Sequence, residues 1–319
     1  MKTKDIYELA IKLGIEADPR DKKRIESILK EEDKKYKDLK KEDKELYDTE
    51  KIKNPFPDTR VFVDNGKEIK KILVGIDMES SEILLADRLN EKGEGIDLVI
   101  AHHPEGNAYA NLSLAMGMQA DVSCVFGVPI NVAESVLGPR MSEISRAVHP
   151  ANHQRPVDMA RILKINFMCM HTPADNNVQK YLQNIFDTKK PEKVSDVVNI
   201  LKEIQEYRKA TKQNAGPKIF CGSEDRSAGK VMVDMTGGTG GPKEAYEKLS
   251  QAGVGTIVAM HISEDSRKEA EAHHINVVIA GHIASDSLGM NLILDKLEEK
   301  GIEIVPCSGL IRVNRGKKK

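Results

Sequence analysis

Short runs of β-branched and aliphatic residues alternate with longer amphipathic stretches along most of the chain. Runs of this length predict buried strands, and the amphipathic stretches between them predict helices. The predicted strands cover residues 71–76, 97–101, 165–170, 230–235, 255–260, 276–280 and 301–305. Strands that alternate with helices are typical of an α/β protein with a largely parallel sheet. We therefore predict an α/β fold, with largely parallel or mixed sheets flanked by helices and arranged in two similar lobes.

Apolar positions at helical spacing predict the intervening helices. They cover residues 80–90, 175–186, 194–210, 243–252, 264–273 and 286–300. Residues 109–163 are also mostly helical in pattern, with breaks predicted at residues 127–129 and 138–139, where glycine and proline occur together. Proline removes a backbone donor and clashes with the preceding turn, so it usually ends or kinks a helix.

The beginning of the chain has a different pattern. Between residues 21 and 50, Lys, Glu and Asp alternate, and the few apolar residues occur at roughly helical spacing. Such a pattern is typical of a solvated helix supported by neighbouring opposite charges. The prolines of the Asn-Pro-Phe-Pro motif at residues 54–57 then disfavour helix. We predict a charged helical extension over residues 1–56 and an α/β domain over residues 57–319, with lobes of roughly 57–215 and 216–319.

Composition limits which binding partners and which cellular compartment can be expected. The net charge is -1, and aromatic residues make up 4% of the chain with no Trp, so neither a nucleic acid nor a membrane is expected as a partner. The four cysteines are scattered without a C-x-x-C pair, which is typical of a reducing cytosol and excludes a cysteine-caged zinc module. The N-terminus lacks an apolar signal core, and no apolar run reaches about 18 residues. A cytoplasmic protein is therefore expected.

Histidines follow the predicted strands at unusual frequency. Strand 97–101 runs directly into His102-His103-Pro, and the strand at residues 165–170 is followed by His171 and then Asp175. Similar motifs, His261 to Glu264 and His282 to Asp286, follow two strands of the second half. Each motif alone is weak evidence, but ligands of parallel sheets bind at the carboxyl ends of the strands. Their coincidence at one sheet edge predicts a metal site.

The residue types indicate which metals fit. Imidazole with carboxylate suits zinc, iron, manganese or nickel, without the thiolates of a structural zinc site. Adjacent histidines point in different directions, so His102 and His103 can serve two neighbouring ions, and Asp175 is the expected bridging carboxylate. His282 and Asp286 can converge on one ion from the start of a helix. We expect two divalent transition metal ions per chain, with His171 or Glu105 as the proton shuttle.

A glycine-rich turn follows the predicted strand at residues 230–235. Gly237, Gly238 and Gly240 precede the helix expected at residues 243–252, where backbone N–H groups could approach an anion. The spacing fits neither the phosphate-binding P-loop nor the dinucleotide-binding motif. A tight strand-to-helix turn without a ligand is the alternative interpretation.

The motifs, in this order along residues 60 to 310, resemble those of the Nif-three-like family of dinuclear metal-centre proteins, some of which are called type-two GTP cyclohydrolase I. The resemblance implies metal ligands at His102, His103, Asp175, His282 and Asp286, with His171 at the edge of the site. It also implies a ring-shaped homohexamer. The family's last motif usually ends in Glu, whereas this chain has Asp286.

Two functions remain open at this point. The first is a metal-dependent hydrolase acting on a small anionic molecule, such as a nucleotide or another phosphate-bearing compound, because two cations attract an anion and can activate water. GTP ring opening is the version that the family resemblance implies. The second is a non-catalytic protein that binds and delivers a metal or metallocofactor, or regulates a partner.

Overall fold

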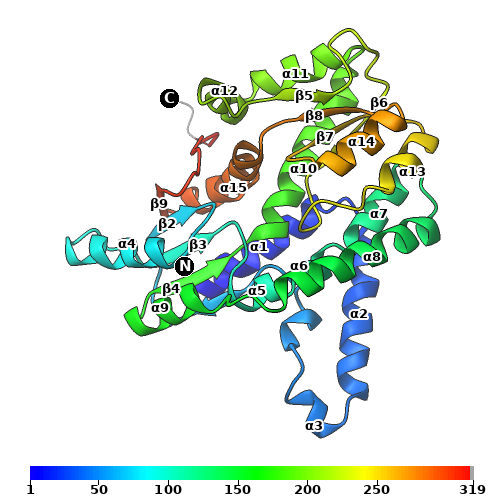
Figure 1. The fold of residues 1–319 in the computed structure, drawn as a ribbon. Coiled ribbons are helices and arrows are strands. Elements are labelled where there is room, and N and C mark those ends of the chain that lie inside the picture. Colours follow the sequence, from blue (N-terminus) through cyan, green and yellow to red (C-terminus); the bar gives the residue numbers. More distant parts are fainter. Residues whose placement is uncertain (317–319) are drawn as a thin grey trace.

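Two mixed β-sheets flanked by helices form the structure, a computed structural model that describes residues 1–316 (Figure 1). The strand orders are β1-β4-β3-β2-β9 and β5-β8-β7-β6, with antiparallel pairing only of the edge strands β1 and β5 among the residues described. The strands are β1 (Val61–Val63), β2 (Lys71–Gly75), β3 (Leu98–Ala101), β4 (Asn166–Cys169), β5 (Lys218–Cys221), β6 (Lys230–Asp234), β7 (Val254–Ala259), β8 (Asn276–Ile279) and β9 (Glu303–Pro306). The predicted fold class is confirmed.

The sequence pattern located all the buried strands and missed two of the exposed ones. All seven predicted strands are present with ends within two residues of those expected. The two additional strands, β1 and β5, are edge strands with mostly half-exposed or exposed residues, so neither carries a continuous apolar run.

Helices cover both faces of each sheet. On the first sheet, one face packs against α4 (Ser80–Glu91) and α9 (Arg155–Leu163), and the other against α1 (Thr3–Ala17) and α15 (His282–Glu298). On the second sheet, one face packs against α10 (His171–Lys189), α11 (Val194–Glu203) and α12 (Gln205–Lys212). Its other face packs against α7 (Met118–Val125), α8 (Ile130–Val148), α13 (Ala245–Gln251) and α14 (Glu264–Ala272). The short helices α5 (Gly106–Ala110) and α6 (Leu112–Ala115) connect the two halves.

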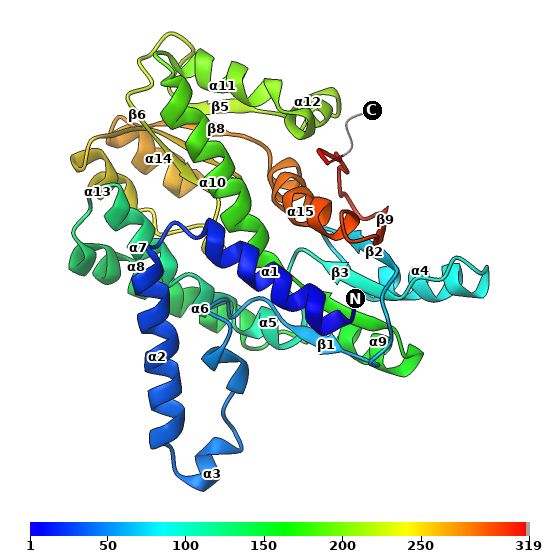
Figure 2. The same cartoon turned by 180° about the vertical axis from the view of Figure 1, so that it is seen from behind.

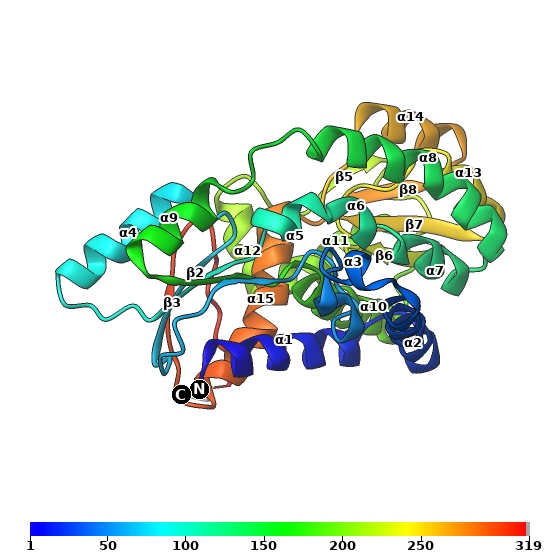
Figure 3. The same ribbon diagram turned by 90° about the horizontal axis from the view of Figure 1, so that it is seen from below.

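Helices α10 and α15 pack against each other between the two sheets (Figure 3). Their contact is very close at Gly289, where a Cβ atom would collide with the carbonyl oxygen of Ala174. Any larger residue would push the helices apart beside Asp175 in α10 and Asp286 in α15. The fold therefore places the beginnings of two helices, one following each sheet, next to one another.

The predicted N-terminal extension requires a correction. Helix α1 packs along α10 (Figure 2), and its Ile6 and Ala10 are buried in the core of the first sheet. Only α2 (Lys22–Asp38) and α3 (Lys41–Lys44) project as an arm before the 3₁₀ helix η1 (Thr49–Ile52) returns the chain to the body. The charge pattern identified the solvated arm, but the apolar face of α1 has its partner far along the chain.

Three further details differ from the expectation. The C-terminal strand β9 pairs with β2 of the first sheet, so the second lobe does not contain the whole of residues 216–319. Helix α8 continues through Gly138 and Pro139 because both lie on its exposed side, where water can bond the freed carbonyl group. The helix predicted at residues 194–210 is divided at Ile204. Within residues 1–316, no helix is both long and apolar enough to cross a membrane.

We predict that the arm can be shortened without loss of stability. Tyr47 contacts Glu32, with its hydroxyl 3.3 Å from the Glu32 carbonyl oxygen, so a short Gly-Ser linker can replace residues 33–46. Thermal unfolding of this variant should match that of the parent. In contrast, Ile6→Ala in α1 should lower the free energy of unfolding by about 3 kcal/mol, because it opens a cavity in the core. Equal stability of Ile6→Ala and the parent would show that α1 is not part of the core.

Candidate metal centre

The candidate ligands come from both sheets. His102 and His103 follow β3, and His171 follows β4 and begins α10, so all three lie at the carboxyl edge of the first sheet. His282 follows β8 of the second sheet and begins α15. Gly281, just before it, has a φ of +112°, a conformation that favours glycine and turns the chain sharply into the helix.

Asp175 and Asp286 lie one helical turn after His171 and His282, which points each carboxylate at the histidines. Nε2 of His102 lies 3.5 Å from Oδ1 of Asp175 and 3.4 Å from Oδ1 of Asp286. The other oxygen of Asp286 lies 3.6 Å from Nε2 of His103 and 3.6 Å from Nε2 of His282. The structure thus brings together all five residues predicted as ligands.

Three groups of ligand atoms in this cluster are close enough to hold an ion. They are His102 with Asp175 and Asp286, His103 with His282 and Asp286, and His102 with His103 and His171. Asp286 belongs to the first two groups and presents one oxygen to each. This shared position is the one that the sequence led us to expect for Asp175.

Several ligand atoms are buried without a hydrogen bond. In the part of the chain that the structure describes, they include both ring nitrogens of His102, Oδ1 of Asp175 and both carboxylate oxygens of Asp286. Leaving one buried polar atom unpaired costs about 1–3 kcal/mol, and an unpaired charged group costs more. A cation between these atoms would satisfy them together, so the residues present fit a metal.

Two aspartates orient the histidines from behind. Nδ1 of His103 donates to Oδ1 of Asp77 at 2.6 Å, and Nδ1 of His171 donates to the buried Asp58 at 2.8 Å. Thr172 also donates to Asp58. A carboxylate on one ring nitrogen fixes the tautomer and leaves Nε2 free to bind a metal, as is usual for histidine ligands.

Without a bound cation, the pKa values of the buried residues in the cluster are strongly shifted. Burial lowers the pKa of His102 to about 4 and raises the pKa of Asp175 well above its usual range. Burial also disfavours charge on His171, but the carboxylates of Asp175 and Asp58 outweigh it and raise the pKa of that ring to about 9. Bound cations would favour the ionised carboxylate and neutral His102 that coordination requires.

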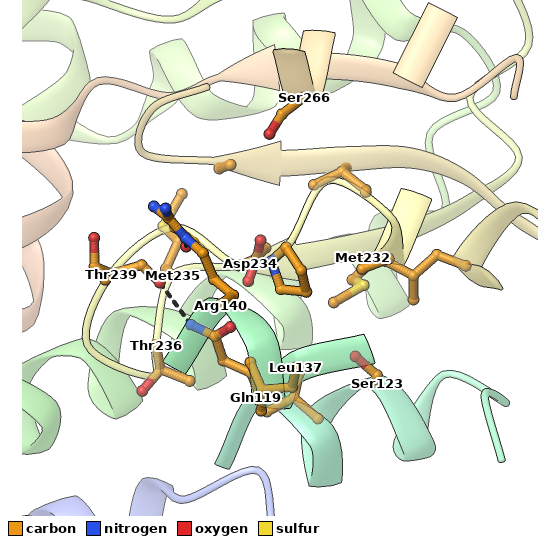
Figure 4. A pocket seen from close by; sticks show the side chains of 18 of the residues that line it. Gln119, Ser123, Leu137, Arg140, Met232, Asp234, Met235, Thr236, Thr239 and Ser266 are labelled. Atoms are coloured by element: carbon orange, nitrogen blue, oxygen red, sulfur yellow. Dashed lines mark hydrogen bonds between the residues drawn. The ribbon is translucent and has the colours of Figure 1, made fainter. Parts of the chain in front are cut away.

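A cavity opens from the metal cluster into the second half of the molecule. Figure 4 shows the part of its wall that carries Gln119, Arg140 and Asp234. The cavity lies between α7, α8 and the strands β6 and β7. His171, Asp175, His261 and His282 line it at the cluster. Asp286 is only 1% exposed, whereas the His282 side chain is 41% exposed, so the accessible part of the cluster is around His282.

The glycine-rich turn forms one wall of this cavity. Gln119 donates to the carbonyl oxygens of Gly237 and Thr239 at 2.7 and 2.6 Å, and Arg140 donates to that of Gly240 at 3.2 Å. These contacts fix the turn to α7 and α8. The following helix has only seven residues, so the turn is better understood as a cavity wall than as a phosphate loop.

A scan of the sequence against protein-family models finds no match, and a search of curated proteins finds none either. Solved structures do match. A NIF3 superfamily protein from Sphaerobacter thermophilus is 28% identical, with a TM-score of 0.71 over 80% of this chain and 92% of that one. This similarity supports the assignment of the chain to a Nif3-like family.

Other solved structures of lower similarity include reduced HcgD from Methanocaldococcus jannaschii, which is 17% identical with a TM-score of 0.48 over 76% of this chain and 86% of that one. The hypothetical protein SA1388 from Staphylococcus aureus is 14% identical with a TM-score of 0.45 over 82% and 92% of the two chains.

The fold also places near the metal cluster and its cavity several residues that were not predicted as site residues. Asp77 follows β2, so the strand-end rule would have found it, but Asp58 lies in the segment interpreted as a boundary. His261, noted at the end of β7 but not chosen as a ligand, has its ring centroid 5.3 Å from that of His282. Asp234 at the end of β6 lines the cavity.

Glu105, predicted as a proton shuttle, does not line the cavity. Burial, with a contribution from the charge of Glu79, raises its pKa to about 7. That value suits proton transfer, but the residue lies on the Asp77 side of the cluster. His171 is both in the cluster and on the cavity wall.

We predict that Asp58→Asn and Asp77→Asn weaken metal binding without abolishing it. Loss of the carboxylate behind a ligand histidine typically lowers metal affinity about 10–100-fold, because ring orientation and basicity change. Competition with a chromogenic chelator would measure this. Asp38→Asn in the exposed arm is the matched control and should bind like the parent. Parent-like affinity in both test variants would mean that the histidines do not depend on these carboxylates.

Proposed function

We propose that this Nif3-like protein is a metal-dependent hydrolase that holds two divalent transition metal ions and acts on a small anionic molecule, such as a nucleotide or another phosphate-bearing compound. One observation supports it most strongly: buried, unpaired His and Asp atoms lie at the end of an open cavity. Enclosure beside a cavity is typical of a site that meets a ligand.

The distances between ligand atoms suggest how the residues of the cluster would hold two ions. In this proposal one ion is held by His102, Asp175 and Asp286, and the other by His103, His282 and Asp286. Asp286, rather than Asp175, is then the bridging carboxylate. Aspartate suffices here because α15 begins directly at His282, which brings the backbone of residue 286 close to the histidines.

Two such ions, when bound, would polarise a substrate oxygen and lower the pKa of a nearby water. His171 is the candidate for proton transfer. Its Nδ1 is held by Asp58, and its Nε2 lies 3.7 Å from Oδ2 of Asp175 and faces the cluster. The ring thus lies between the carboxylates of Asp58 and Asp175, a position from which it can pass a proton to a leaving group.

Positive side chains around the cavity support an anionic substrate. Arg140 and Lys248 line it, together with His261. Burial, with smaller contributions from His282 and the Arg140 guanidinium, lowers the pKa of His261. Arg140 and His261 both lie beside Gly240, toward the metal end. A phosphate bound between Arg140 and the ions would meet charge on both sides.

Metal content is the first test. We expect about two equivalents of metal per chain in protein purified without chelators, measured by inductively coupled plasma mass spectrometry. Asp286→Asn should fall below one equivalent because both ions lose a ligand, and Asp175→Asn should retain about one. Glu105→Gln is the control and should retain both. A full complement of metal in Asp286→Asn would exclude it as the bridge.

Turnover is the second test. Protein loaded separately with zinc, iron or manganese should hydrolyse at least one member of a panel of nucleotides and phosphoesters that includes GTP. His171→Gln should lower the rate at unchanged metal content, because it removes the proton donor and not a bridging ligand. Stoichiometric transfer of metal to an acceptor, without turnover, would instead support the delivery function.

The homohexamer that the family resemblance implies and the cytoplasmic location expected from the sequence remain parts of this proposal. Mass photometry of the purified protein would measure the number of chains in the assembly.

A further inference from the structure

The cavity extends well past the metal cluster and changes character along its length. Near the cluster it is polar, whereas between α8 and the second sheet its walls are apolar. Residues of the apolar end include Val128, Ala133, Leu137, Met232, Leu249 and Ile257. These side chains belong to one buried cluster of the core, so the apolar end is built into the fold.

One carboxylate, that of Asp234, lies between the polar and the apolar ends. It belongs to the last residue of β6, and Figure 4 shows it in the middle of the cavity between Arg140 and Met232. No hydrogen bond or ion pair to this carboxylate is found among residues 1–316. Asp234 belongs to none of the three groups of possible ligand atoms, so it is not part of the metal centre.

Arg140, a cation of the cavity wall, is already engaged by other partners. Arg140 donates to the Gly240 carbonyl oxygen and pairs with Glu143 at 2.7 Å, and it makes no ion pair with Asp234. Asp234 is half-buried, and burial raises its pKa to about 6. Its carboxylate reaches the cavity without a counter-ion among the described residues. A carboxylate in an apolar-walled cavity is costly unless a donor reaches it.

We propose that Asp234 recognises a positively charged or N–H-rich nitrogen group of an organic ligand, whose apolar body occupies the space between α8 and strands β6 and β7. The ligand's remaining end would then face Arg140, His261 and the metal cluster. That this ligand is the substrate rests on the proposed function above, whereas the proposal that the ligand binds at Asp234 does not.

Chemistry and shape both favour this class of ligand. A nitrogen cation that donates to a carboxylate makes a charge-assisted hydrogen bond, which is roughly twice as strong as a neutral one. The apolar walls formed by Leu137, Met232 and Ile257 suit a ring or short aliphatic group. An anionic group placed at Asp234 would instead meet like charge in a poorly solvated site.

Three aromatic probes of one shape provide the test: benzamidine, benzamide and benzoate. Their dissociation constants would be measured by ligand-observed NMR on the full chain, both metal-depleted and metal-loaded. In metal-depleted protein, benzamidine should bind at least about tenfold more tightly than benzoate, with benzamide between them. Metal-depleted protein is needed because benzoate could also bind the metals.

Asp234→Asn should remove the preference for benzamidine, whereas Asp265→Asn, an exposed aspartate beside the cavity residue Ser266, should keep it. The Asp234 variant should unfold at no lower temperature than the parent, because it removes an unpaired carboxylate. Equal binding of all three probes by the parent, or an unchanged preference in Asp234→Asn, would overturn the proposal. If the preference holds but no metal binds, the ligand site stands and the hydrolase proposal fails.

Discussion

The close packing of α10 against α15 is the contact on which the candidate site depends. Each helix begins immediately after a strand, α10 after the first sheet and α15 after the second. Gly289 lets the helices approach until a Cβ would strike the Ala174 carbonyl group. This approach places carboxylate oxygens of Asp175 and Asp286 3.5 and 3.4 Å from Nε2 of His102. Without it, the two sheets would each carry half of a site.

Keeping this site assembled imposes a cost on the fold. Buried carboxylates and imidazoles that lack partners destabilise the protein unless a cation joins them. The surrounding core offsets that cost, since strands β2, β3 and β4 are buried and α1 closes the first sheet from outside. A core that tolerates unpaired polar atoms at one place is typical of a functional centre.

The cavity gives the two sheets different roles. The first sheet supplies His102, His103 and His171, with the aspartates that orient them, and so forms the rigid back of the centre. The second sheet supplies His261, His282 and Asp234, which lie on the cavity wall. Chemistry would therefore be fixed by the first sheet, and the choice of ligand by the second. The glycine-rich turn of this wall is fixed in place by Gln119 and Arg140.

Local sequence determined the buried strands and the residues at their ends, because short β-branched runs and the histidines that follow them are local features. His102, His103 and His282 could be predicted in this way, and the family resemblance strengthened the prediction. The tertiary structure alone decided which residues meet across the two sheets. Asp58 has no local signal for its role, whereas Asp77 and Asp234 carry only their positions at strand ends. Asp286 occupies the shared position because of helix packing. Likewise α1 is core because its partner α10 lies more than 150 residues further along the chain, a contact that no local pattern encodes.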